Sequence, residues 1–217
     1  MKVGTDALLL GSWAALPNTG AILDIGAGSG ILSLMLAQRS DGALPITALE
    51  IDPDAATQAT ENVAESPWAD TIGVVHADAL QWQPASLFSL IISNPPFFTD
   101  SLGSPKASRH RARHTDSLPF AALLDRVVRW LAPDGQFSLI LPVISAQHVI
   151  VLAESLGWFV QRCCMVQPAP HKVAHRWLLS LTRQACATEK SSMVIKDQSG
   201  DYSPEYRHLT QAFYLRF

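Results

Sequence analysis

The segment Asn94-Pro95-Pro96-Phe97 follows an apolar run and carries groups that suit the binding of an amino group. The side-chain oxygen of Asn94 and the carbonyl of Pro95 are two hydrogen-bond acceptors, and prolines fix φ so that a backbone carbonyl can point into a pocket. Phe97 adds a flat face on which a ring can stack. These four residues therefore predict a catalytic site for an amino group conjugated to a ring. Asn and Pro are also common in turns, so a strand that ends in a proline-bounded turn is the alternative interpretation.

A glycine-rich motif, Asp24-Ile-Gly26-Ala-Gly28-Ser-Gly30, lies between an apolar run and a helix-compatible stretch. Glycine lets the backbone approach a ligand closely, and the start of a helix offers N–H donors. A nicotinamide site requires Gly-x-Gly-x-x-Gly/Ala, and Ile31 occupies the sixth place here. The remaining Gly-x-Gly-x-Gly spacing, with an acidic residue before it, is similar to the S-adenosylmethionine loop of class I methyltransferases.

Two acidic residues, Glu50 and Asp78, end the next two predicted strands. Glu50 comes about twenty residues past the glycine loop, where a carboxylate would hold a ribose diol. In class I methyltransferases the carboxylate at the place of Asp78 lies against the adenine amino group of the cofactor. Either acid could instead cap a helix. Four successive strand ends with matching chemistry favour a cofactor site.

Apolar runs alternate with helix-compatible stretches along the first two thirds of the chain, which predicts a doubly wound α/β sheet. Gly135 is expected to end the helix that precedes the fifth strand. The predicted strands cover residues 21–26, 46–51, 72–76, 88–93 and 136–142, and the predicted helices cover 6–15, 30–38, 53–65, 118–131 and 145–156.

The pattern changes after Gly157. Residues 159–166 and 176–183 predict an antiparallel closing hairpin, and residues 188–203 form a polar stretch. The aromatic tail over 210–217 is expected to pack on the body of the protein. The prediction is thus a seven-stranded, Rossmann-like sheet, mostly parallel, in one domain over residues 1–217.

Composition narrows the class of protein further. The chain has 217 residues, of which 48% are hydrophobic, and it contains no apolar run of about twenty residues that would predict a membrane span. Its first residues, Met1-Lys2-Val3, lead into a Gly-Thr-Asp sequence that does not suit a signal peptide. We therefore expect a cytoplasmic protein with no membrane span. A monomer is favoured, and the sequence leaves the oligomeric state open.

Neither the cysteines nor the histidines predict a metal site. The adjacent Cys163 and Cys164, together with Cys186, lack Cys-x-x-Cys spacing, and adjacent cysteines cannot bridge without strain. His171 and His175 have the i, i+4 spacing of a helical metal pair, but prolines precede them and the following sequence alternates like a strand.

Positive charge is concentrated just after the Asn-Pro-Pro-Phe segment. The whole chain has a net charge of −3, yet Lys106, Arg109, Arg111 and Arg113 fall within eight residues, interspersed with histidines. Such a segment can make several phosphate contacts beside a catalytic pocket, so we expect it to bind RNA. A solvated, mobile basic loop without a ligand is the alternative. Three more distant cations, Lys172, Arg176 and Arg183, are candidates to extend the patch.

Together the glycine loop and Asn-Pro-Pro-Phe resemble the amino-methylating branch of the class I methyltransferases. Residues 1–6, 62–68 and 209–215 further resemble the bacterial valine tRNA adenine-N(6)-methyltransferase family, and the resemblance runs over essentially the whole chain. It implies S-adenosylmethionine as the cofactor and the adenine 3′ of the anticodon, at position 37 of valine tRNA, as the target. It also adds Gly4 and Thr5 to the cofactor-binding residues Asp24, Gly26, Gly28, Gly30, Glu50, Asp78 and Asn94. Members of the family carry a further amino-terminal segment, which we expect to be missing here.

Other functions use similar residues. The same acceptor pair can hold a glutamine amide, as in methyltransferases that modify release factors, or a guanine amino group, as in ribosomal RNA methyltransferases. The basic segment and the absence of an additional helical domain argue against the first, and the absence of a duplicated domain argues against the second. A non-catalytic RNA-binding module is the alternative outside the enzymes.

The basic segment yields a first prediction. If Arg109, Arg111 and Arg113 bind phosphate groups, their joint replacement by Ala weakens tRNA binding and leaves S-adenosylmethionine binding unchanged. The slope of log affinity against log salt concentration should fall by about 0.7 to 0.9 for each phosphate interaction that the replacement removes. Titration of fluorescent tRNA at several salt concentrations measures the slope for each protein. Equal slopes for the two proteins would mean that these arginines do not bind phosphate.

Overall fold

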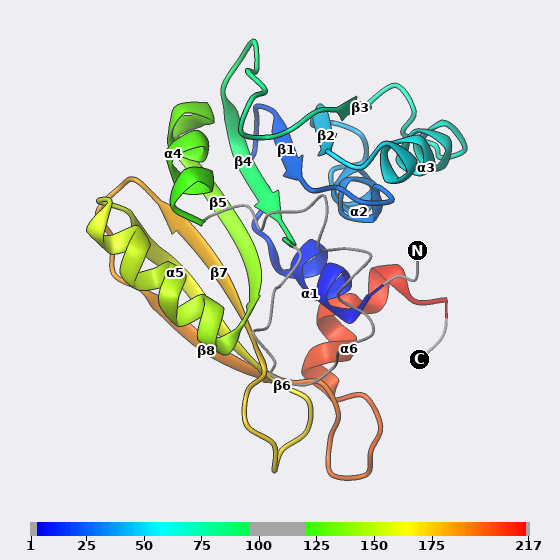
Figure 1. Ribbon diagram of the computed structural model, residues 1–217. Coiled ribbons are helices and arrows are strands. Elements are labelled where there is room, and N and C mark those ends of the chain that lie inside the picture. Colours follow the sequence, from blue (N-terminus) through cyan, green and yellow to red (C-terminus); the bar gives the residue numbers. More distant parts are fainter. Residues whose placement is uncertain (1–3, 96–119, 216–217) are drawn as a thin grey trace, which may run out of the picture.

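A single eight-stranded sheet forms the centre of the computed structural model, which describes residues 4–95 and 120–215 (Figure 1). The spatial order of the strands is β3-β2-β1-β4-β5-β7-β6-β8. The strands are β1 (Ile22–Ile25), β2 (Ile46–Glu50), β3 (Ile72–His76), β4 (Phe88–Ser93), β5 (Leu131–Pro142), β6 (Phe159–Gln167), β7 (Arg176–Thr182) and β8 (Glu189–Val194). The helices are α1 (Thr5–Trp13), α2 (Ile31–Arg39), α3 (Pro53–Ala64), α4 (Phe120–Trp130), α5 (Val143–Ser155) and α6 (Pro204–Thr210), followed by a short 3-10 turn over Gln211–Phe213.

Strands β1 to β5 are parallel, and β7 lies antiparallel between β5 and β6. This arrangement confirms the predicted Rossmann-like α/β class with an antiparallel hairpin. The predicted count of seven strands was wrong by one, because β8 forms within the polar stretch and pairs parallel with β6. The first four residues of β8 are exposed. An edge strand can form through backbone hydrogen bonds alone, so its sequence need not alternate.

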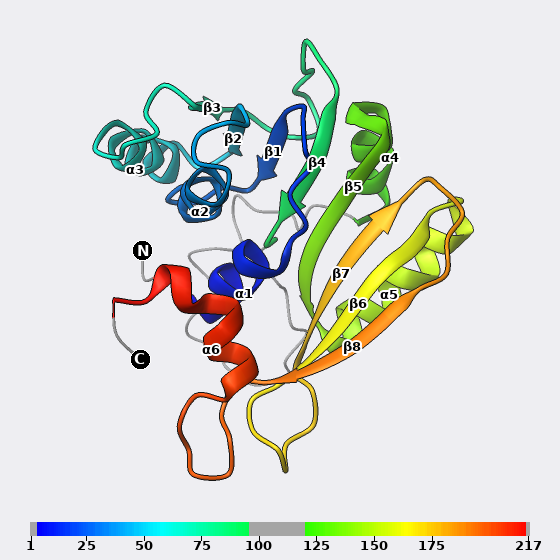
Figure 2. The same ribbon diagram turned by 180° about the vertical axis from the view of Figure 1, so that it is seen from behind.

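Helices cover both faces of the sheet, which is why the central strands are continuously apolar. In Figures 1 and 2, α4 and α5 lie on one face, and α1 and α2 lie on the other. Ile22 and Leu90 point to the α1 and α2 side, whereas Leu23 and Ile91 point to the α4 and α5 side, and all four side chains are fully buried. Successive residues of a strand alternate between faces, so each strand contributes to two cores.

The helix predicted over residues 118–131 corresponds to α4, but the expected helix stop at Gly135 was wrong, because Gly135 lies inside β5. The helix ends at Trp130, and β5 begins at the next residue with a break in its register to β4. Pro133 disfavours helical conformation at the residue before it, so the helix ends earlier than a glycine stop would place it.

The carboxy-terminal segment packs on α1 and α2, as predicted, as far as Tyr214, whereas Leu215 is exposed. The ring of Tyr206 is buried, and its hydroxyl lies 3.0 Å from that of Tyr214. The side chain of Gln38 on α2 donates to the carbonyl of Ala212 at 2.9 Å. Helix α1 is therefore enclosed between the sheet and the end of the chain (Figure 2).

Candidate cofactor and target site

A cavity of about 540 Å³ lies where β1 and β4 end, within the size range of small-molecule sites. The order of strands reverses at β1, and parallel α/β sheets place their ligands at this point. Of the predicted site residues, Gly4, Thr5, Gly26, Gly28, Asn94 and Pro95 line this cavity. Its other lining residues are Asp6, Ala7, Ala27, Ser29, Ile31, Leu32 and His175.

The glycine loop adopts a backbone shape that needs glycine. Gly26, Gly28 and Gly30 have φ of 73°, 57° and 81°, in the left-handed region that L side chains rarely adopt. A Cβ built on Gly26 would meet no atom within 4 Å, whereas one on Gly30 would lie 3.4 Å from Ala59 of α3. Gly26 therefore borders open space, while Gly30 packs against a helix and does not line the cavity.

The carboxylate of Glu50 stabilises the glycine loop through hydrogen bonds to backbone amides. It accepts hydrogen bonds from the amides of Gly28 at 2.7 Å and of Ile51 and Asp52 at 2.9 Å each. The side chain is buried and does not line the cavity. A carboxylate has about four acceptor positions, so three bonds leave one for a ligand hydroxyl. The assignment of Glu50 to a ribose diol stays a prediction.

Asp24 lies fully buried beneath the same loop. One of its oxygens accepts a hydrogen bond from the Ser33 hydroxyl at 2.8 Å, and the other has no partner among the described residues. Burial raises the pKa of Asp24 to about 7, the Ser33 bonds oppose this shift, and the nearby Glu50 adds to it. Asp24 supports the loop and does not line the cavity.

Of the remaining predicted residues that the structure describes, Asp78 does not line the cavity. Asp78 accepts hydrogen bonds from the amide of Leu80 at 2.8 Å and from the side chain of Gln81 at 3.1 Å, which is the arrangement of a turn cap. Its contact with adenine stays a prediction. Pro96, Phe97, Lys106, Arg109, Arg111 and Arg113 lie outside the described residues.

Sequence reasoning missed His175, which is exposed and lines the cavity. It immediately precedes β7, and an antiparallel strand begins at the edge where its parallel neighbours end. That topology is the signal that could have placed His175 beside Asn94. Within residues 4–95 and 120–215, no three His, Cys, Asp or Glu side chains gather in a metal-binding group, and no helix is long and apolar enough to span a membrane.

Comparison with known proteins identifies the family. Residues 2–141 match the family model described as the methyltransferase small domain. The tRNA1(Val) (adenine(37)-N6)-methyltransferase of Tolumonas auensis is 44% identical over 216 residues, which are 100% of this chain and 91% of the relative. The enzyme of the same name from Vibrio cholerae is 45% identical over 216 residues, which are 100% of this chain and 89% of the relative. The chain belongs to this family.

The predicted family resemblance is therefore confirmed, and solved structures agree on the fold. A crystal structure of a predicted O-methyltransferase from Agrobacterium tumefaciens has a TM-score of 0.76 at 21% identity, covering 95% of this chain and 96% of that one. A glycopeptide N-methyltransferase in complex with S-adenosyl-L-methionine has a TM-score of 0.57 at 16% identity, covering 78% and 90%. Both share the fold of this chain.

The raised pKa of Asp24 predicts a pH dependence of stability. The folded protein retains the Asp24 proton where the unfolded chain releases it, so ionisation of Asp24 lowers the free energy of unfolding as pH rises from 3.8 to about 7. We expect Asp24→Asn to gain stability relative to the unchanged protein over this window, by at most about 1.4 kcal/mol per pH unit. Urea unfolding at several pH values measures the difference. Asp70→Asn, at an exposed position, is the control, and equal pH profiles for both variants would contradict the prediction.

Proposed function

We propose that the protein transfers a methyl group from S-adenosylmethionine to the exocyclic amino group of adenine 37, 3′ of the anticodon, in valine tRNA. One observation carries this proposal: Asn94 and Pro95 line the same cavity as the glycine loop, so the amino-group acceptors and the cofactor loop face one space. The names of the relatives, at 44% and 45% identity over the full chain, support the choice of substrate.

The residues of the cavity fit this cofactor. Left-handed glycines at 26 and 28 allow a ligand to lie close to the backbone, and the open space beside Gly26 admits it. The bound cofactor supplies a methyl group activated by a cationic sulfur. Gly26 and Gly28 would hold its amino-acid end, Glu50 its ribose and Asp78 its adenine, while Gly4 and Thr5 would close the cavity from the side of α1.

Asn94 and Pro95 would act on the target amine rather than on the methyl donor. The amino group of adenine is a weak nucleophile because its lone pair is delocalised into the ring. Two acceptors, the Asn94 side-chain oxygen and the Pro95 carbonyl, favour a pyramidal nitrogen whose lone pair faces the methyl group. Pro96 would fix the turn, and Phe97 would stack on the ring. The proton leaves after the nitrogen becomes positively charged, so no strong general base is needed.

A single-stranded loop suits such a site, because an unstacked base enters a pocket without the cost of opening a duplex. Lys106, Arg109, Arg111 and Arg113 would contact the phosphates around it. In this proposal the protein acts in the cytoplasm, where the tRNA is found, and as a monomer.

A methylation assay with two RNAs tests the proposal. The purified protein is incubated with radiolabelled S-adenosylmethionine and one of three substrates: an unmodified valine tRNA transcript, a transcript that carries guanine at position 37, or a release-factor protein. Label in N6-methyladenosine from the first RNA alone is the expected result. Label in the guanine transcript or in a release-factor protein would favour one of the other amino methyltransferase functions. Cofactor binding without transfer to any of these would favour a non-catalytic module.

The role of Asn94 gives a variant prediction. Asn94→Ala should lower turnover on tRNA by about 10²-fold or more, because the transition state loses one hydrogen-bond acceptor. The affinity for S-adenosylmethionine should stay within a few fold. Asn18→Ala, in the exposed loop before β1, is the matched control and should retain full activity. Near-normal turnover of Asn94→Ala would remove Asn94 from the catalytic site.

A further inference from the structure

Arg176, at the start of β7, joins two parts of the cavity wall that are far apart in the sequence. Its Nε lies 2.8 Å from a carboxylate oxygen of Asp6, in the first turn of α1. Its Nη1 also donates a hydrogen bond to the carbonyl of His175 at 3.0 Å. Asp6 and His175 both line the cavity, whereas Arg176 does not. The guanidinium of Arg176 therefore binds two residues of the cavity wall, Asp6 and His175, without lining the cavity itself.

The Asp6–Arg176 pair is better shielded than an ordinary surface ion pair. The two side chains are 23% and 26% exposed. The exposed Asp125–Arg129 pair on α4 has a separation of 3.2 Å and exposures of 56% and 63%. Surface pairs contribute little because water screens them, and a charged hydrogen bond in a partly buried place contributes more. The exposed Asp125–Arg129 pair can therefore serve as the control for the shielded Asp6–Arg176 pair.

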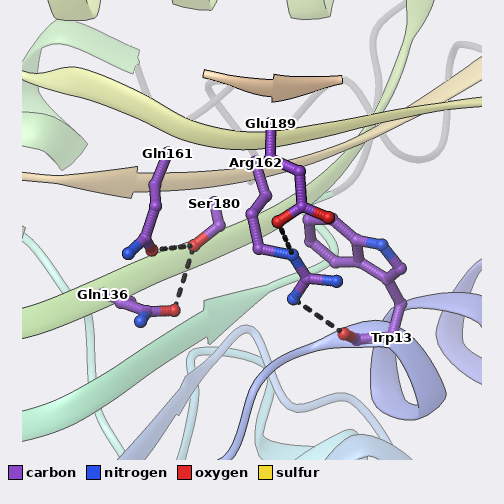
Figure 3. A network of polar contacts seen from close by, with 6 residues as sticks. All are labelled: Trp13, Gln136, Gln161, Arg162, Ser180 and Glu189. Atoms are coloured by element: carbon purple, nitrogen blue, oxygen red, sulfur yellow. Dashed lines mark hydrogen bonds and ion pairs between the residues drawn. The ribbon is translucent and has the colours of Figure 1, made fainter. Parts of the chain in front are cut away.

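The other end of α1 is fixed without Arg176 (Figure 3). Arg162 lies over the ring of Trp13 at 4.3 Å from its centroid, donates to the Trp13 carbonyl at 3.5 Å and reaches Glu189 of β8 at 3.8 Å. Arg39 donates to the carbonyls of Gly11 and Ala14 at 2.8 and 2.7 Å. These arginines satisfy carbonyls that the end of a helix leaves without partners.

The first turn of α1 has weaker local support. Its N-cap residue is Gly4, which offers no side-chain cap, and Thr5 is exposed. The buried leucines Leu9 and Leu10 anchor the middle of the helix in the core. Ala7 also packs in the core, and the contact between Asp6 and Arg176 ties the exposed start of the Gly4–Ala7 segment to the start of β7.

We propose that Asp6 and Arg176 are positioning residues that hold the Gly4–Ala7 segment against the cavity and thereby set its affinity for S-adenosylmethionine. The inference rests on the proposed function for the identity of this ligand. It predicts that removal of the pair weakens cofactor binding far more than it weakens the fold, because only one turn of one helix is released.

Calorimetric titration with S-adenosylmethionine tests the proposal without any RNA. Arg176→Ala should raise the Kd roughly tenfold, and Asp6→Ala should raise it by a similar factor. The double variant should bind no more weakly than either single variant, because both remove the same interaction. Arg176→Lys, which keeps the charge beside Asp6, should recover most of the affinity. Arg129→Ala is the matched control and should leave the Kd unchanged.

A structural measurement on the ligand-free protein separates positioning from folding. Hydrogen exchange of the amide of Leu8, which donates to the Gly4 carbonyl at 3.2 Å, should accelerate in Arg176→Ala. The thermal unfolding temperature should change little. Equal Kd values for Arg176→Ala and Arg129→Ala, or a weaker Kd only in proportion to a general loss of stability, would overturn the proposal. If the unchanged protein binds no S-adenosylmethionine, the proposed function itself fails, and this outcome is distinct from the first.

Discussion

The buried carboxylate of Glu50 fixes the shape on which the rest of the site depends. Its bond to the Gly28 amide ties the glycine loop to the end of β2, where the amides of Gly26 and Ala27 also donate to the Leu49 carbonyl at 2.8 and 3.1 Å. The loop is thus held by two neighbouring residues of one strand. Because the Ile51 and Asp52 amides both donate to Oε1 and the Gly28 amide donates to Oε2, the acceptor position that is left lies on Oε2, beside the Gly28 amide.

A second buried carboxylate, that of Asp24, lies under the same loop, and its hydrogen bonding differs from that of Glu50. Asp24 and Glu50 are both buried, and two ionised carboxylates close together in a protein interior repel each other. Glu50 accepts hydrogen bonds from three backbone amides, whereas Asp24 has one hydroxyl donor and an oxygen without a described partner. Burial and the nearby Glu50 therefore act in the same direction and raise the pKa of Asp24.

Short sequence motifs predicted several of the residues that line the cavity, whereas other features of the site depend on tertiary structure. The left-handed glycines and the Asn94-Pro95 acceptors follow from short segments whose residue types carry their own geometry. His175 and strand β8 did not follow, because each is defined by its neighbours: His175 by the direction of β7, and β8 by backbone pairing along β6. The inward orientation of Glu50 was also invisible in the sequence, since a strand-end carboxylate can cap amides or face a ligand equally well.

The cavity depends on parts of the chain that the family model does not reach. That model ends at residue 141, yet His175 lines the cavity, and the neighbouring Arg176 donates a hydrogen bond to its carbonyl. The same later region supports α1 from behind, through Glu189 of β8 and through α6, which packs against it. Helix α1, which carries the amino-terminal motif to the cavity, therefore packs against segments from the last third of the chain. The two walls of the site are separated by 170 residues in sequence and meet through a single guanidinium.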